Sequence, residues 1–109
     1  MKEIKAYIKK HKLDGVIRAL RKIGGLSGLS VIDSRGYGLG WGGAGGDAQV
    51  ESRPGVKLEI VCQNDLVDQV VATIEKAAYT GLKGDGKIYV GSIEQAVRIS
   101  TGERGKGAV

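Results

Sequence analysis

The N-terminal part of the chain changes the period of its apolar residues from two to about 3.6. Ile4, Ala6 and Ile8 alternate with other residues, which predicts a half-buried strand over 4–8. The apolar residues that follow are Leu13, Val16, Ile17, Leu20 and Ile23, with Gly24 and Gly25 behind them. Their spacing is that of one helical face, and the glycines are suited to end it, so a helix is predicted over 13–23.

The same pair of periods returns in the second half of the chain. Alternating apolar residues predict a strand over 56–62, and Asn64 or Asp65 is suited to cap a helix after it. The helical spacing of the first unit is repeated at Val67, Val70, Val71, Ile74 and Ala77. Further extended stretches are predicted over 29–35 and 87–90.

The resulting order of elements, β-α-β-β-α-β, predicts an α+β protein with the ferredoxin-like fold, in which two helices cover one face of a four-stranded antiparallel sheet. A chain of 109 residues has the size of one domain, so we expect a single domain over 1–109. Val61 and Ile32 are expected to point to the other face. Association with further subunits is one way to bury that face, although an antiparallel sheet can also face water on one side.

The stretch 36–46, GYGLGWGGAGG, holds seven glycines in eleven residues between the second and third strands. Ordering so much glycine costs backbone entropy, so we expect a mobile loop over about 37–54, and long loops are often functional. Trp41 offers enough apolar area to anchor a partner protein, and it can equally fold back on the domain. After the last strand we expect a C-terminal tail over about 101–109.

The net charge of +5 and the pI near 9.4 allow nucleic acid, an anionic membrane surface or phosphate ligands as partners. Nucleic acid is not expected, because RNA-binding domains with this element order stack bases on aromatic residues of their central strands, and 56–62 contains none. No apolar run is long enough to cross a bilayer. We therefore expect a cytoplasmic protein that is not embedded in the membrane.

The sequence does not indicate catalysis or metal binding. His11 and Cys62 are the single histidine and the single cysteine, too few for the usual nitrogen and sulfur metal site. Cys62 lies among apolar residues and is expected to be a small buried hydrophobe. Since no carboxylate or nucleophile stands at a useful spacing from His11, we expect no catalytic residues and no enzyme activity.

A second glycine cluster, 81–87, joins the second helix to the last strand. Glycines on both sides of Asp85 let consecutive N–H groups point at an anion, while Lys83 and Lys87 supply positive charge. The cluster is either a phosphate-binding loop or, since Asp-Gly is a common turn dipeptide, only a tight turn. The glycines at 38–43 also fit a dinucleotide-binding motif, but the helix that this motif requires is not predicted after them.

Two stretches make the chain similar to the PII signal-transduction family along nearly its whole length. One is Lys12-Leu13-Asp14 with Val16 and Ala19-Leu20, and the other is Thr80-Gly81, 84–90 (GDGKIYV), Arg98-Ile99 and Thr101-Gly102-Glu103. The resemblance implies a homotrimer that binds an adenine nucleotide (ADP, AMP or ATP) in clefts between subunits, with the need for Mg²⁺ left open. It also implies a long loop that controls a target protein, such as a membrane transporter or a metabolic enzyme.

The resemblance also assigns residues to these two roles. The nucleotide is expected to contact Ser30, Gly36, Gly38, Glu59, Val61, Gly84, Asp85, Gly86, Lys87 and Arg98, the last reaching in from the adjacent subunit. The partner protein is expected to contact Tyr37, Leu39, Trp41, Asp47, Glu51 and Arg53.

At three positions the chain lacks charged residues of the family pattern. Leu39 and Ser100 stand in the place of phosphate-binding arginines, and Gly55 stands in the place of a lysine that pairs with 2-oxoglutarate. Each lost contact is worth roughly 1.5–3 kcal/mol. We therefore expect ADP or AMP to bind more readily than ATP, and 2-oxoglutarate not to be sensed in the usual way. The alternatives are a structural trimer of the same fold without ligand and a small nucleic-acid-binding domain.

Overall fold

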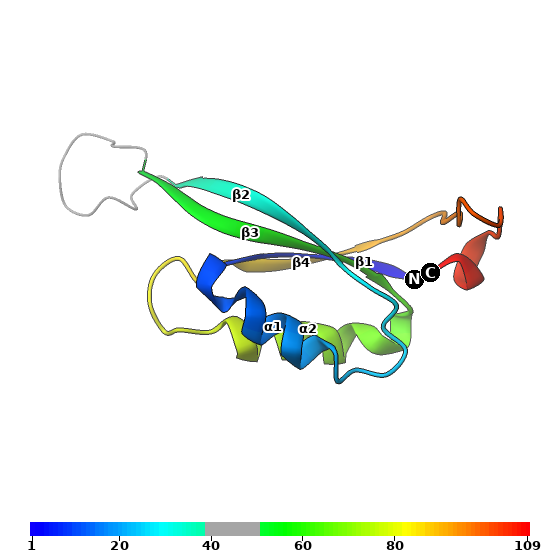
Figure 1. Cartoon of the computed structure of the whole chain (residues 1–109), viewed down its shortest axis with the longest axis horizontal. Coiled ribbons are helices and arrows are strands. Elements are labelled where there is room, and N and C mark those ends of the chain that lie inside the picture. Colours follow the sequence, from blue (N-terminus) through cyan, green and yellow to red (C-terminus); the bar gives the residue numbers. More distant parts are fainter. Residues whose placement is uncertain (39–50) are drawn as a thin grey trace.

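The computed structural model describes residues 1–38 and 51–109 of the chain. Its strands are β1 (Lys2–Ile8), β2 (Ser30–Gly38), β3 (Glu51–Cys62) and β4 (Lys87–Ser92), and its helices are α1 (Leu13–Leu20) and α2 (Val67–Ala78). The strands form one antiparallel sheet in the order β2-β3-β1-β4, and both helices lie on one face of it (Figure 1). The predicted ferredoxin-like arrangement is confirmed. Neither of these two helices has the length and apolar character needed to cross a membrane.

The core lies where the alternating residues of β1 and β3 meet the helices. The strand register places Ile4, Ala6 and Ile8 opposite Ile60, Leu58 and Val56, and all six are buried. The buried helix residues that complete this core include Val16, Leu20, Val70 and Ile74. Cys62 is also buried, as predicted, and desolvation raises the pKa of its thiol. Burial of these side chains explains why the strands show period two and the helices period 3.6.

Helix α1 is shorter than the apolar pattern predicts, because it ends at Leu20 and not at Ile23. The chain then turns tightly, and the Ile23 N–H donates to the Leu20 carbonyl oxygen at 3.0 Å. Gly25, with a φ of 88°, takes the left-handed conformation that glycine tolerates best. Ile23 is nevertheless buried in the core. The pattern therefore identified a buried side chain correctly but assigned it the wrong backbone conformation.

The predicted cap of α2 is wrong. Asn64 and Asp65 belong to a short 3-10 turn that ends at Leu66, and neither side chain caps the helix. The Leu66 N–H donates to the Gln63 carbonyl oxygen at 3.1 Å. The turn leads directly into α2, as 3-10 turns often do at the start of helices.

Strands β2 and β3 are longer than predicted and leave the sheet as a two-stranded ribbon (Figure 1). Their pairing continues to Gly38 opposite Glu51. The predicted loop over about 37–54 was therefore too long at both ends. Residues 37–38 and 51–54 belong to the strands, where ladder pairing satisfies their backbone hydrogen bonds. Leu39, Trp41, Asp47 and the side chain of Glu51, all expected to contact a partner, lie outside the described residues.

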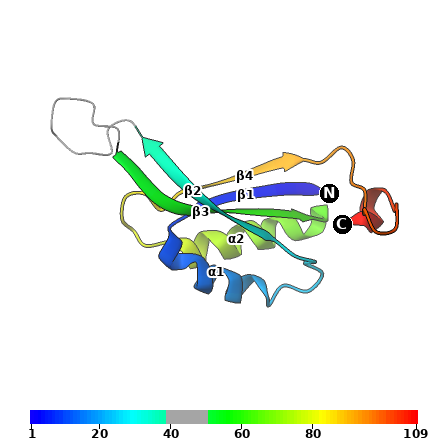
Figure 2. The ribbon, with the colours of Figure 1, turned by 45° about the horizontal axis from the view of Figure 1, so that its top comes forward.

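The sheet face turned away from the helices, called here the helix-free face, carries Val61 and Ile32 as predicted. Figure 2 shows β1, β3 and β4 lying over both helices. On the helix-free face Tyr7 and Tyr89 meet edge to face, with ring centroids 6.1 Å apart, and Lys57 Nζ lies 5.8 Å from the Tyr7 ring centroid. The face therefore combines apolar, aromatic and charged groups.

Residues 101–109, expected as a tail, are folded against the domain. Val97 and Arg104 form an antiparallel bridge, and Gln63 Nε2 donates to the Lys106 carbonyl oxygen at 2.9 Å. These contacts place the C-terminal segment at the end of the sheet opposite the ribbon of β2 and β3 (Figure 1).

Replacing Leu58 by Ala is expected to lower the free energy of unfolding by about 2–5 kcal/mol, because Leu58 is 0% exposed and its loss leaves a cavity in the core. Ile99 is 98% exposed, so Ile99→Ala is the matched control and is expected to change stability by less than about 0.5 kcal/mol. Urea denaturation followed by circular dichroism measures both. Equal effects of the two substitutions would contradict the assignment of the core.

Candidate functional site

The glycine cluster between α2 and β4, called here the glycine loop (residues 80–87), is folded around the side chain of Asp85. The carboxylate accepts hydrogen bonds from the Thr80 N–H at 2.8 Å, from the Gly81 N–H at 3.1 Å and from the Thr80 hydroxyl. The Thr80 hydroxyl oxygen in turn accepts from the Leu82 N–H at 3.1 Å. Asp85 therefore holds the first half of the loop in one conformation.

Lys9, directly after β1, ties the glycine loop to the sheet. Its Nζ lies 3.1 Å from Asp85 Oδ1 and donates to the Thr80 hydroxyl oxygen at 3.1 Å. Hydrogen bonds from Thr80, and then those from Lys9 and Gly81, lower the pKa of Asp85 well below its ordinary value. The carboxylate is therefore ionised at neutral pH, and its charge is balanced inside the loop.

Two glycines of the loop occupy positions that a side chain would disturb. At Gly86, with a φ of 102°, a Cβ would stand 1.6 Å from the Tyr7 carbonyl oxygen. At Gly84, with a φ of 83°, it would stand 2.8 Å from Arg53 Nη1 and 3.8 Å from Lys9 Cε. The loop backbone consequently lies directly against β1 and against the side chains of Arg53 and Lys9.

A hollow of about 300 Å³, called here the glycine-loop hollow, opens where this loop meets the ribbon. It is lined by Tyr7, Ile8, Lys9, Ser34, Gly36, Arg53, Pro54, Gly55, Gly84 and Gly86. No carboxylate is among these described lining residues. The backbone N–H groups of Gly84 and Asp85 donate no hydrogen bond to any described residue. The hollow thus combines two cations with nearby amide donors, a combination suited to an anion.

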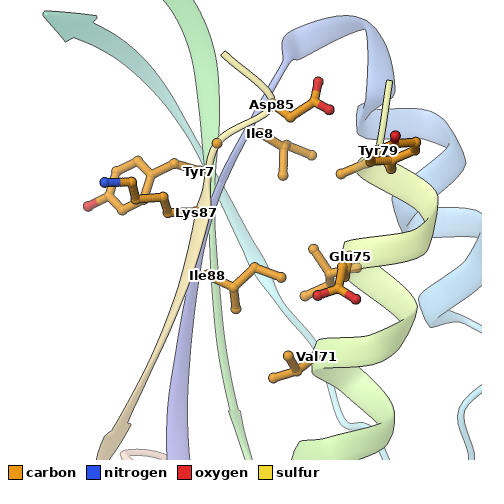
Figure 3. A pocket seen from close by; sticks show the side chains of 11 residues that line it. Tyr7, Ile8, Val71, Glu75, Tyr79, Asp85, Lys87 and Ile88 are labelled. Atoms are coloured by element: carbon orange, nitrogen blue, oxygen red, sulfur yellow. The ribbon is translucent and has the colours of Figure 1, made fainter. Parts of the chain in front are cut away.

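A second cavity, of about 370 Å³, lies between α2 and the strands β1 and β4 and is called here the helix-side hollow (Figure 3). Val71 and Ile88 form apolar walls, and Glu75, Tyr79 and Asp85 lie around it. Lys87 also lines it. Its side chain, however, lies beside Tyr7 on the side of the strands away from α2 (Figure 3).

A third hollow, of about 600 Å³, lies at the opposite end of the sheet and is called here the far hollow. It brings together Ser30, Glu59, Val61 and Arg98 from β2, β3 and the segment that follows β4. The Glu59 carboxylate pairs with Lys57 Nζ at 2.7 Å, and this hydrogen bond lowers the pKa of Glu59. Arg98 Nε lies 3.9 Å from Glu103 Oε1.

The residues expected to bind nucleotide thus fall into two groups within one chain. Gly36, Gly84 and Gly86 line the glycine-loop hollow, with Asp85 and Lys87 adjoining them. Ser30, Glu59, Val61 and Arg98 line the far hollow. Gly38 lines none of the three hollows described above, although it ends β2.

Sequence reasoning missed Lys9 as a site residue and assigned Arg53 only to partner contacts. The structure places both beside Gly84. The period of two along β1 could have indicated Lys9, because it continues the positions of Lys5 and Tyr7 on the same face. For Arg53 no local signal exists, since its neighbour Gly84 is distant in the sequence. Tyr37, also expected to contact a partner, is 62% exposed on the ribbon.

Known proteins are similar to this chain over its whole length. The family model described as nitrogen regulatory protein P-II matches residues 1–103. Proteins named nitrogen regulatory protein P-II from Bradyrhizobium diazoefficiens, Rhodospirillum rubrum and Haemophilus influenzae are 46%, 45% and 43% identical to it, and each alignment covers all of both chains.

Asp85→Asn is expected to destabilise the protein at neutral pH, because the neutral amide cannot reproduce the contacts of the carboxylate with Thr80 and Lys9. Since folding lowers the pKa of Asp85 below its ordinary value of 3.8, the carboxylate stabilises the fold above that pH and loses this effect as the pH falls below it. The difference in free energy of unfolding between the wild type and Asp85→Asn should therefore shrink below about pH 4.

Urea denaturation at pH 7, 5 and 3 measures this difference. Asp33→Asn is the control, because Asp33 is an exposed carboxylate for which the described residues provide no ion pair. A constant difference across the pH range, or equal behaviour of the two variants, would contradict the proposed role of the Asp85 carboxylate.

Gly86→Ala is expected to lower the free energy of unfolding by more than about 3 kcal/mol, because the new Cβ would overlap the Tyr7 carbonyl oxygen. Gly102→Ala separates this overlap from backbone strain, since Gly102 has a φ of 74° and open space around its Cβ position. Gly102→Ala should lower the free energy of unfolding by only about 1–2 kcal/mol. Thermal and urea denaturation measure both variants, and similar losses would show that the close approach to β1 is unimportant.

Proposed function

The chain belongs to the nitrogen regulatory protein P-II family, whose members are signalling regulators, and from this premise we propose that it binds an adenine nucleotide between the subunits of a homotrimer and thereby controls a target protein. The observation that carries the proposal is the glycine-loop hollow. Backbone amides, Lys9 and Arg53 meet there around a space without carboxylates among its described lining residues. Such a site suits the phosphates of a nucleotide.

The division of the expected site residues between two hollows favours binding between chains. The glycine-loop hollow offers cations and amides, whereas the far hollow offers the Ser30 hydroxyl and the Glu59 carboxylate. A carboxylate repels phosphates but can accept hydrogen bonds from a base or a ribose. We assign phosphate binding to the glycine-loop hollow of one subunit and base or ribose binding to the far hollow of the next. Arg98 would then come from the neighbour.

The helix-free face supports the assembly of several copies. Tyr89 is 53% exposed and Ile32 is 45% exposed on this face of a single chain. Association with further copies would remove this apolar and aromatic surface from water. The charged groups of the same face are partly paired, as at Lys57 and Glu59, and can therefore be buried at a smaller cost.

Contact with a target protein is assigned to the ribbon and the segment that it carries. The ribbon extends away from the sheet, and Tyr37 is exposed on it (Figure 1). A projecting ribbon can enter a groove of another protein without moving the core. We propose a cytoplasmic regulator whose target is a membrane transporter or a metabolic enzyme.

Leu39 and Ser100 stand where the family pattern has phosphate-binding arginines, and this loss of charge favours nucleotides with fewer phosphates. We therefore propose that ADP or AMP binds more readily than ATP. The absence of a cation at position 55 likewise argues against 2-oxoglutarate as a second ligand.

The purified protein is expected to have the native mass of a trimer and to be stabilised by adenine nucleotides. A ligand at 100 times its dissociation constant adds about 2.7 kcal/mol to the free energy of unfolding. A thermal-shift panel of ATP, ADP, AMP and guanine nucleotides, together with native mass spectrometry, measures both properties.

Arg98→Ala should abolish most of the shift without changing the native mass, because Arg98 lines the far hollow. Arg104→Ala is the matched control, since Arg104 is an exposed arginine of the same segment outside the lining of that hollow. A monomeric mass would overturn the proposed site between subunits. A trimer that no nucleotide stabilises would instead indicate a structural role.

A further inference from the structure

We propose that Arg53 binds the outer phosphates of the ligand in the glycine-loop hollow and sets how many phosphates that ligand carries. This rests on the proposed function, in which the same hollow receives the phosphate end of a nucleotide. It gives Arg53, a residue of the strand β3, a role as a ligand contact in addition to the partner contact that the family resemblance implies for it.

The first observation is the position of the guanidinium. Arg53 is half-buried, and its Nη1 lies 2.8 Å from the point where a Cβ on Gly84 would stand. The side chain therefore extends from the ribbon to the backbone of the glycine loop. Lys9 Cε lies 3.8 Å from the same point. Both cationic side chains thus lie close to Gly84, and both line the hollow.

The second observation is that glycines surround Arg53. Gly36 is its partner across the β2–β3 ladder, and Gly55 follows two residues along β3 on the same face. Gly84 lies against the guanidinium, and all three glycines line the hollow. None of the three contributes a side chain to the lining of the hollow.

The third observation is that the two cations are held by different parts of the chain. Lys9 is shared with Asp85 and Thr80, so its position is fixed by the glycine loop. Arg53 comes from a different element, the ribbon. An anion that contacts the loop amides and Arg53 together must therefore lie between the loop and the ribbon. We assign the loop amides to the first phosphate of the ligand and Arg53 to the phosphates beyond it.

The guanidinium suits this role better than an ammonium. Its planar fork of N–H donors matches two phosphate oxygens at once, whereas a lysine offers a compact point charge. Arg53→Lys keeps the charge but loses this geometry. Arg53→Ala loses both.

Isothermal titration calorimetry with ATP, ADP, AMP and inorganic tripolyphosphate tests the proposal on the full-length protein. Charge-assisted hydrogen bonds lead us to expect that Arg53→Ala raises the dissociation constants of ATP, ADP and tripolyphosphate about 10- to 100-fold. The dissociation constant of AMP should change by less than about 3-fold, because its single phosphate is held at the loop amides. Arg53→Lys should give intermediate losses.

Arg35→Ala is the matched control. Arg35 pairs with Pro54, next to Arg53 in the sequence, and alternation places it on the other face of the ribbon, outside the lining of the hollow. It removes the same charge and should change each dissociation constant by less than about 3-fold. Equal losses in Arg35→Ala and Arg53→Ala, or equal losses for ATP and AMP, would overturn the proposal.

The titration with tripolyphosphate distinguishes the proposed role of Arg53 from the proposed nucleotide-binding function. Binding of tripolyphosphate that depends on Arg53, without binding of any adenine nucleotide, would support the role of Arg53 and overturn the nucleotide function. Nucleotide binding that is the same in Arg53→Ala and the wild type would overturn the role of Arg53 and leave the function standing. A wild type that binds neither ligand would overturn both.

Discussion

The Asp85 carboxylate points into the glycine loop, where it accepts hydrogen bonds from Thr80 and Gly81 and pairs with Lys9. Two consequences follow from this one set of contacts. The loop is held against the end of β1, and the negative charge of Asp85 is balanced before any ligand arrives. Without this balance a carboxylate beside the glycine-loop hollow would repel phosphates. The same residue thus gives the loop its shape and leaves the backbone amides to act as donors.

Absence of side chains is as important to this site as their presence. Gly86 lies so close to the Tyr7 carbonyl oxygen that no Cβ fits, and Gly84 lies against the Arg53 guanidinium. At Gly55 a Cβ would stand 3.0 Å from the Ile8 carbonyl oxygen, and Gly36 lines the glycine-loop hollow without a side chain. A chain rich in glycine therefore uses it in two ways. Within the described part, Gly55 and Gly86 permit close approach of backbone segments, and Gly84 permits close approach of a cationic side chain.

Local patterns predicted the elements of the fold because each strand and helix has one face against a common core. The alternation at β1 and β3 corresponded to buried side chains. At α2 the helical spacing identified Val70 and Ile74 as buried, whereas Val67, Val71 and Ala77 are only partly buried. The errors occurred at the ends of elements. Ile23 is buried from a turn and not from α1, and β2 and β3 continue as a ribbon through residues whose composition favours a loop. At such positions pairing with a distant segment outweighs local preference.

The sequence by itself determined the order of elements, most of the buried residues and the residues of the glycine loop, because each of these depends on neighbours within a few positions of the chain. It also determined the family, because residues typical of the family recur along nearly its whole length. It did not determine which groups meet at the site. Lys9, Arg53 and Gly84 are separated by long stretches of sequence, and Ser30 and Arg98 meet at the other end of the sheet. Only the tertiary structure decided these contacts, because they arise from strand register and chain reversal, which bring together side chains that no local period connects.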